Sequence, residues 1–240
     1  MSDAGPHVTE ALPIVLVPGL CGTPLLFGEQ IPALWRFGPI VLADQTRHDT
    51  MPAIASDILN VAPPRFALVG MSGGGYIALE IMRHAPERVE RLALLNTSAR
   101  PDTAEQTETR RATIEIANAG EFDEFAEQVF PRLVHPAHRK DERLLGIVRS
   151  MAEDTGPDAF VREQVAIISR ADSRPDLGAI SCPTLVLTSE ADSVISPDES
   201  AELADGIRGA RLMKVPRAGH CTSLEQPKRV TEALLDWLDG

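Results

Sequence analysis

In this 240-residue chain, the residue whose surroundings most clearly suggest a chemical role is a serine between glycines. Ser72 is the centre of a Gly-Met-Ser-Gly-Gly segment that follows the apolar run Phe66–Val69 and precedes a stretch with helical spacing. Gly-x-Ser-x-Gly between a strand and a helix is typical of a nucleophile elbow, which holds the serine hydroxyl clear at the end of the strand. Glycines are needed there because side chains would collide in so tight a turn. The motif therefore predicts covalent catalysis by Ser72.

A serine hydroxyl becomes a good nucleophile only when a base takes its proton. The chain has six histidines, and only His220 falls in a loop after a late predicted strand. Gly219, directly before it, would let that loop turn sharply and bring the imidazole over the end of the sheet. His220 is therefore the predicted base.

The base in turn needs an acid that orients it. Asp192 stands at the carboxyl end of the predicted fifth strand, one element before His220. The order Ser72, Asp192, His220 is the order in which nucleophile, acid and base occur in one large class of hydrolases. Glu190 and Asp198 are nearby competitors. We interpret Glu190 as a solvated loop charge and Asp198 as a carboxylate at a helix N-terminus.

Attack on a carbonyl also creates an oxyanion, which two backbone N–H groups usually stabilise by about 3–4 kcal/mol each. Gly73, just after the nucleophile, supplies one of them at the start of its helix. The loop after the first strand should supply the other. Pro18 has no N–H and Gly19 permits the turn, so Leu20 is the natural donor, with Cys21 as second choice.

Six short apolar runs are typical of strands buried on both faces of a parallel sheet. They are Ile14–Val17, Ile40–Leu42, Phe66–Val69, Arg91–Leu95, Thr184–Thr188 and Arg211–Val215. Helical patterns lie between them, which indicates an α/β protein with helices on both faces of the sheet.

Residues 98–179 break this rhythm, because they contain helical stripes and no convincing strand. A structureless loop of that length would be implausible. We therefore predict a core of residues 1–97 and 180–240 and a helical cap, or lid, of residues 98–179, inserted after the fourth strand. Ligands of open parallel sheets bind beyond the carboxyl ends of the strands, where this insertion departs and returns.

In the order of its motifs, nearly the whole chain resembles the α/β-hydrolase superfamily. The matching stretches are Leu16–Gly19, Val69–Gly74, Ala85–Val89, Cys182–Leu187, Glu190–Asp192, Ala218–His220 and Leu224–Pro227. The resemblance implies Ser72, Asp192 and His220 as a catalytic triad and Leu20 and Gly73 as oxyanion donors, the same residues that the chemistry selects.

Two features depart from the family pattern. Pro18-Gly19 stands where many relatives have His-Gly, so whatever that histidine side chain supports is absent, while the backbone donor is expected to remain. Only thirteen residues precede Ile14, too few for the N-terminal hairpin that is common in the family. We therefore expect a sheet of six strands, all parallel.

The resemblance implies hydrolysis of a carboxylic ester or lactone through an acyl-enzyme, with no metal or organic cofactor. A low aromatic content of 4% favours an aliphatic pocket and a small, apolar acyl group. A carbon–carbon bond hydrolase and a cofactor-free perhydrolase use the same triad and stay open as alternatives. So does a receptor on the same fold that binds a small ligand without catalysis.

Net charge, the length of apolar runs and the cysteine spacing limit the partners and the cellular location that we expect. A net charge of −12 disfavours nucleic acid and anionic membranes as partners. No apolar run reaches the length needed to span a membrane. The three cysteines lie far apart, which argues against a disulfide framework or a structural zinc site. We expect a cytoplasmic monomer or homodimer whose partner is a small-molecule ester or lactone.

Overall fold

Six parallel strands form one sheet in the computed structural model, which describes residues 11–122 and 124–240. The strands are β1 (Ile14–Val17), β2 (Ile40–Leu42), β3 (Phe66–Met71), β4 (Val89–Leu95), β5 (Thr184–Ser189) and β6 (Arg211–Val215). All six predicted strands are confirmed, although β3, β4 and β5 extend beyond the predicted bounds. Residues 1–10 lie outside the described residues, so the expectation that the N-terminal hairpin is missing stays a prediction.

The strand order is β2-β1-β3-β4-β5-β6, so the chain reverses its direction of travel across the sheet between β1 and β3. The loops that follow these two neighbouring strands leave on opposite faces, and a crevice forms between them at their carboxyl ends. The predicted oxyanion loop follows β1, and Ser72 follows β3. The topology thus brings both to one place.

Helices cover both faces of the sheet. On one face lie α1 (Ile31–Leu34) and α9 (Pro227–Asp239), and on the other lie α2 (Met51–Val61), α3 (Gly73–His84) and α7 (Pro197–Gly206). Side chains alternate between the two cores along each strand, as the pleat requires. In β1, Ile14 and Leu16 join the core under α1 and α9, whereas Val15 and Val17 join the core under α2 and α3.

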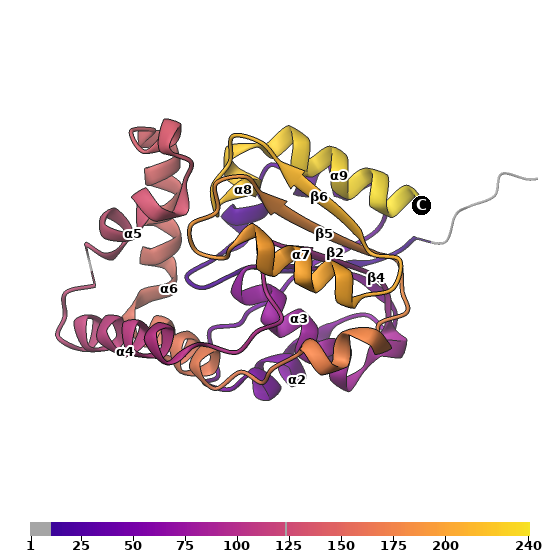
Figure 1. The fold of residues 1–240 in the computed structure, drawn as a ribbon, viewed down its shortest axis with the longest axis horizontal. Coiled ribbons are helices and arrows are strands. Elements are labelled where there is room, and N and C mark those ends of the chain that lie inside the picture. Colours follow the sequence, from indigo (N-terminus) through magenta and orange to yellow (C-terminus); the bar gives the residue numbers. More distant parts are fainter. Residues whose placement is uncertain (1–10, 123) are drawn as a thin grey trace, which may run out of the picture.

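Between β4 and β5 the chain forms α4 (Ala104–Asn118), α5 (Phe125–Leu133) and α6 (Glu142–Ile168). Figure 1 shows these helices together at the end of the sheet toward which the strand arrows point. Here the rings of Phe122 and Phe125 stack, and that of Phe160 packs tilted against both, with centroids 4.7–5.3 Å apart. The helical insertion after the fourth strand is where the sequence predicts it, and its division from the core at residues 97/98 and 179/180 stays a prediction.

A kink divides α6 at Gly156, whose backbone has φ 72° and ψ 164°. Glycine adopts a positive φ without a steric cost, and Pro157 can begin a new helical turn because its missing N–H is not needed there. The second half of α6 therefore runs in its own direction and carries Glu163 and Ile167 to the loop after β1.

Short elements complete the described part: 3-10 helices η1 (Pro24–Phe27), η2 (Pro86–Arg88), η3 (Pro136–His138) and η4 (Arg174–Ala179), and α8 (Thr222–Glu225). Among the described residues, no helix has both the length and the apolar character to cross a membrane.

Candidate active site

Ser72 occupies a strained turn between β3 and α3. Its φ of 54° and ψ of −119° are unusual for a residue with a side chain. A Cβ on Gly70 would overlap the carbonyl oxygen of Gly74, and a Cβ on Gly74 would overlap that of Val17. Only glycine fits at either position, which explains the spacing of the motif. The turn holds the serine hydroxyl at the carboxyl end of the sheet.

His220 stands between Ser72 and Asp192, within hydrogen-bond distance of both. Its Nε2 is 2.8 Å from Ser72 Oγ, and its Nδ1 is 2.9 Å from Asp192 Oδ2. The imidazole and the carboxylate are buried. Because the carboxylate can only accept, Nδ1 carries a proton and Nε2 is left to accept one from the serine. The structure thus brings together three residues that lie far apart in the sequence.

The carboxylate of Asp192 is saturated with hydrogen bonds. Its Oδ1 accepts the backbone N–H groups of Val194 at 2.9 Å and Ile195 at 3.0 Å, and its Oδ2 accepts Asn96 Nδ2 at 2.9 Å. Burial acts to raise the pKa of Asp192, but the charge of His220 and these bonds outweigh burial and hold the pKa below its ordinary value. Asp192 is therefore an anion that stabilises a positive His220.

The loop that carries His220 is fixed by a second buried carboxylate, on Glu225. Its Oε1 accepts the Gly219 N–H at 2.7 Å, and its Oε2 accepts the His135 N–H and lies 2.7 Å from His138 Nδ1. Ser189 Oγ donates to the carbonyl of Gly219 at 2.6 Å. The histidine loop is therefore tied both to the end of β5 and to the insertion.

The two predicted oxyanion donors lie close together. A Cβ built on Gly73 would lie 3.3 Å from the backbone nitrogen of Leu20. Within the described residues, the Leu20 N–H has no hydrogen-bond partner. The second choice, Cys21, has its N–H engaged, because it donates to Glu163 Oε2 at 2.8 Å. Leu20 and Gly73 are thus the free pair next to Ser72.

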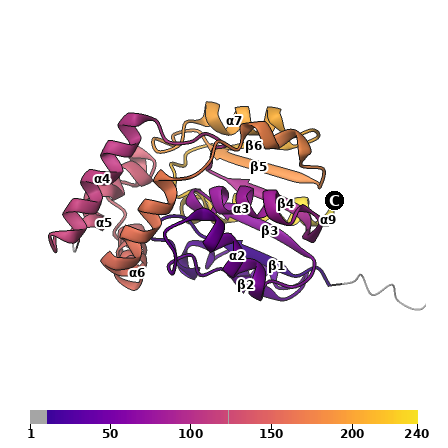
Figure 2. The ribbon, with the colours of Figure 1, turned by 90° about the horizontal axis from the view of Figure 1, so that it is seen from below.

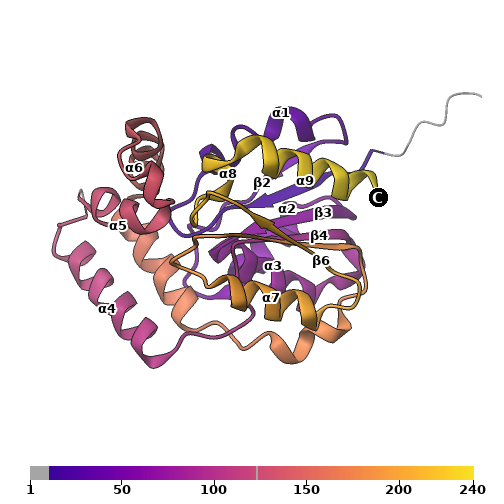
Figure 3. The same cartoon turned by 45° about the horizontal axis from the view of Figure 1, so that its top comes forward.

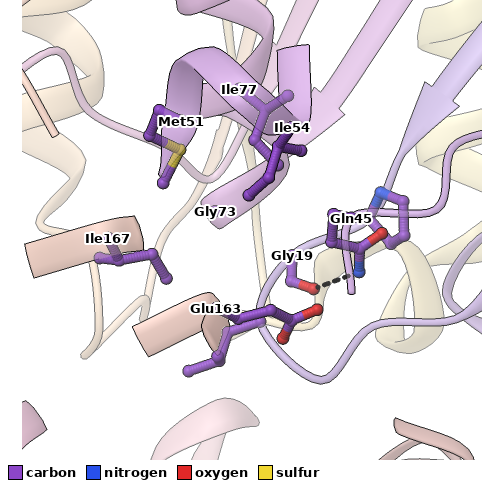
Figure 4. A pocket seen from close by; sticks show the side chains of 10 residues that line it. Gly19, Gln45, Met51, Ile54, Gly73, Ile77, Glu163 and Ile167 are labelled. Atoms are coloured by element: carbon purple, nitrogen blue, oxygen red, sulfur yellow. Dashed lines mark hydrogen bonds between the residues drawn. The ribbon is translucent and has the colours of Figure 1, made fainter. Parts of the chain in front are cut away.

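A small cavity opens beside this pair, with about 230 Å³ of empty space including its mouth. It is lined by Pro18, Gly19, Leu20, Gln45, Met51, Ile54, Gly73, Ile77, Glu163 and Ile167. Figure 4 shows Met51, Ile54 and Ile77 on one side and Glu163 on the other, with its carboxylate directed toward Gly19 and Gln45. The cavity is mainly aliphatic and has a single carboxylate in its wall.

Comparison with known proteins agrees with this geometry. A model of the alpha/beta hydrolase family matches residues 14–233. The chain belongs to the α/β hydrolase family. This confirms the family that the sequence motifs predict.

Three relatives illustrate the similarity across the family. A thermophilic esterase from Thermogutta terrifontis is 30% identical and superposes with a TM-score of 0.86 over 95% of this chain and 89% of its own. The enol-lactonase from Burkholderia xenovorans LB400 is 25% identical, with a TM-score of 0.87 over 98% and 94% of the two chains. RutD of Variovorax paradoxus (strain S110), a proposed carbamate hydrolase, is 28% identical over 98% of this chain and 93% of its own.

Sequence reasoning did not find four residues that support the site of this α/β hydrolase: Asn96, Glu163, Ser189 and Glu225. Asn96 carried a usable signal, because it directly follows β4 and asparagine tolerates the positive φ of 46° found there. Glu163 gave none, since it contacts a turn far away in the chain. Glu225 lies in a stretch that matches the family, but its bond to His135 joins segments that are remote in the sequence. The competitors Glu190 and Asp198 are exposed, and Asp198 lies in the first turn of α7, in keeping with their interpretations as a solvated loop charge and a helix N-terminal carboxylate.

No cluster of three or more histidine, cysteine, aspartate or glutamate side chains that could hold a metal ion occurs in residues 11–122 and 124–240.

Proposed function

We propose that this protein is a serine hydrolase that cleaves a carboxylic ester or lactone through an acyl-enzyme. The observation that carries the proposal is the continuous hydrogen-bonded chain from Ser72 Oγ through His220 to the buried carboxylate of Asp192, with links of 2.8 and 2.9 Å. Its similarity to an esterase and to an enol-lactonase supports the same class of reaction.

In the proposed mechanism, Ser72 Oγ attacks the substrate carbonyl while His220 Nε2 takes its proton. The N–H groups of Leu20 and Gly73 stabilise the resulting oxyanion. His220 then delivers the proton to the leaving alcohol, and the acyl group stays on the serine. A water molecule, activated by the same histidine, attacks the acyl-enzyme and releases the acid. No metal or organic cofactor takes part in these steps.

The acyl group is proposed to be small and mainly apolar. Support comes from the aliphatic side chains of Met51, Ile54, Ile77 and Ile167, which line the cavity next to the oxyanion donors. A carbamate is the second candidate substrate, because the chain is also similar to a proposed carbamate hydrolase and the same attack on a carbonyl would serve. Carbon–carbon bond hydrolysis, perhydrolysis and ligand binding without catalysis remain alternatives.

A fluorophosphonate probe tests the nucleophile. It is expected to label the wild-type protein at Ser72 and to leave the Ser72→Ala variant unlabelled, because the probe reacts only with an activated serine. Hydrolysis of p-nitrophenyl esters of graded chain length should fall at least about a thousandfold in the same variant.

The substrate class is tested by a panel of esters, lactones and carbamates at equal concentration. Short-chain esters or lactones should give the highest kcat/KM. A protein that is not labelled and hydrolyses nothing, yet binds a small ligand tightly, would contradict the proposed function and favour a receptor.

A further inference from the structure

Glu163 is a buried carboxyl group that the proposed mechanism does not use. It lies in the second half of α6 and is only 3% exposed. Its Oε2 accepts the Cys21 N–H at 2.8 Å, whereas its Oε1 is buried, accepts no hydrogen bond of ordinary geometry among the described residues and has the side-chain amide of Gln45 as a polar neighbour of the carboxyl group. A buried carboxyl oxygen without a partner costs stability, so packing alone gives no reason for a glutamate at this position.

The bond to Cys21 holds the turn that carries the predicted oxyanion donor. Cys21 has a φ of 53°, a left-handed conformation that costs energy for any residue with a Cβ. Such a turn persists only where its surroundings hold it. Here the contact comes from α6, far away in the sequence, and it anchors the peptide that directly follows Leu20.

Gln45 holds the same turn from the other side. Its Nε2 donates to the carbonyl of Gly22 at 2.9 Å and to that of Gly19 at 3.3 Å. The Gly19 carbonyl and the Leu20 N–H belong to one planar trans peptide and point in opposite directions. Fixing the carbonyl from one side therefore aims the N–H to the other, toward Gly73. Two side chains, on the loop after β2 and on α6, thus hold successive peptides of the turn.

We propose that Glu163 is a positioning residue for the oxyanion hole: by accepting the Cys21 N–H, it fixes the turn that aims the Leu20 N–H at the substrate oxygen. This inference rests on the proposed function. It gives α6 a role beyond covering the pocket, because the helix then sets the geometry of a group that acts on the reacting atoms. Loss of this positioning should lower kcat and change KM little, since the oxyanion is formed only after substrate has bound.

Three variants, assayed with a p-nitrophenyl ester, test the role. Glu163→Leu removes the acceptor of the Cys21 N–H, and Glu163→Gln keeps a carbonyl acceptor of the same reach without the charge. Gln164→Leu is the matched control. Gln164 is equally buried on the same helix, at 3% exposed, but it bonds Arg110 and Thr113 of α4 and not the oxyanion turn.

We expect Glu163→Leu to lower kcat at least tenfold with KM changed less than threefold, and to slow fluorophosphonate labelling in parallel. Glu163→Gln should recover most of the lost kcat. Gln164→Leu should lower Tm without lowering kcat more than threefold. If Glu163→Leu does not fold, Glu163→Asp makes the same test, because the shortened side chain cannot reach Cys21.

A kcat within threefold of wild type in Glu163→Leu, or equal losses in Glu163→Leu and Gln164→Leu, would overturn the positioning role while leaving the proposed function intact. A loss of kcat that Glu163→Gln does not recover would overturn it too. A wild-type protein that is neither labelled by the probe nor active on any ester would overturn the proposed function, and this inference with it.

Discussion

The tautomer of His220 is set by residues that follow two different strands. Because the Asp192 carboxylate can only accept a hydrogen bond, Nδ1 of His220 carries the proton. Nε2 is then the acceptor for the Ser72 hydroxyl, 2.8 Å away. The backbone N–H groups that bind Asp192 keep the carboxylate charged, so His220 already has its proton on Nδ1 before substrate binds. In the proposed mechanism this arrangement prepares the partly buried Ser72 to lose its proton to His220.

Replacing Asp192 by asparagine tests this orientation. An amide cannot stabilise a positive imidazole and favours the wrong tautomer, so kcat is expected to fall by roughly 10²–10⁴. Steady-state kinetics on a p-nitrophenyl ester would measure it. Asp198→Asn is the control, because Asp198 is exposed in the first turn of α7. Comparable losses in both variants would contradict the assignment of Asp192 as the acid.

Glu163 predicts how stability depends on pH. Burial raises its pKa from 4.5 to about 7, and the bond from Cys21 offsets only part of that effect. Between these values the folded protein holds a proton that the unfolded chain releases. The stabilising contribution of this group is therefore complete below pH 4.5 and is lost as the pH rises toward 7, by roughly 3 kcal/mol.

Urea unfolding of wild type and Glu163→Gln at pH 5 and pH 8 would measure this effect. The glutamine variant cannot ionise, so its stability relative to wild type should increase between the two pH values. Asp44 and Arg162, the nearest charges that act on Glu163, are present in both proteins and cancel in the comparison. A difference that stays constant with pH would show that Glu163 does not titrate in this range.

At the residue scale, the sequence could predict Ser72, Asp192 and His220 because each follows a recognisable strand and their order is informative. It could not predict Glu163 or Glu225. Each of these carboxylates accepts a backbone N–H from a distant segment, Cys21 for Glu163 and His135 for Glu225, and such contacts leave no pattern in the local sequence. Neighbours in space that are remote along the chain can be found only once the chain is folded.

Elements position the site mainly through glycines in close contact with other backbone segments. Apolar runs of four or five residues sufficed to predict the longer strands, because strands buried on both faces need no polar alternation. The kink in α6 was not predicted, since Gly156 and Pro157 are common loop residues and the apolar pattern on either side belongs to separate helices. Helix boundaries depend on such backbone details more than on periodicity.

Gly74→Ala is expected to disrupt the elbow. Its new Cβ would meet the carbonyl of Val17 in β1, and neither backbone can move without breaking the sheet. We expect a loss of more than about 3 kcal/mol in stability, or failure to fold, together with loss of labelling. Denaturant unfolding and probe labelling would measure both.

Gly146→Ala makes a suitable control for this change. Gly146 lies in the first half of α6, where an added Cβ meets no atom within 4 Å. Alanine there should be neutral or stabilising by up to about 1 kcal/mol, because it favours the helix. If Gly74→Ala changed stability and probe labelling no more than Gly146→Ala does, the close backbone contact at Gly74 would not be what requires glycine there.

On the scale of the whole molecule, an ion cluster ties parts of the insertion together, and one of its arginines also contacts the core. Asp102, after β4, pairs with Arg110 of α4 and with Arg170 after α6, and its side chain is 1% exposed. Arg170 also lies over the ring of Tyr76 in α3, 4.1 Å from its centroid. These contacts hold α4 and the segment after α6 against each other and against α3.

Asp102→Ala is therefore expected to destabilise the protein by about 3–5 kcal/mol, because it leaves two arginines buried without their partner. For a chain of this size, Tm should fall by on the order of 10 °C. Glu108→Ala serves as control, since Glu108 pairs with Arg111 on the exposed face of α4 and such pairs contribute less than about 1 kcal/mol. If thermal unfolding showed the same fall in Tm for Asp102→Ala and Glu108→Ala, the cluster around Asp102 would contribute no more to stability than an exposed ion pair.

The order of the strands has a consequence for synthesis of the protein. The elbow and the oxyanion turn are encoded in the first third of the chain, whereas Asp192 and His220 follow β5 and β6, which are made last. A chain still emerging from the ribosome can display the serine but has no base to activate it. If the proposed mechanism holds, hydrolysis begins only when β5 and β6 have joined the sheet, and the appearance of hydrolase activity during translation would time that step.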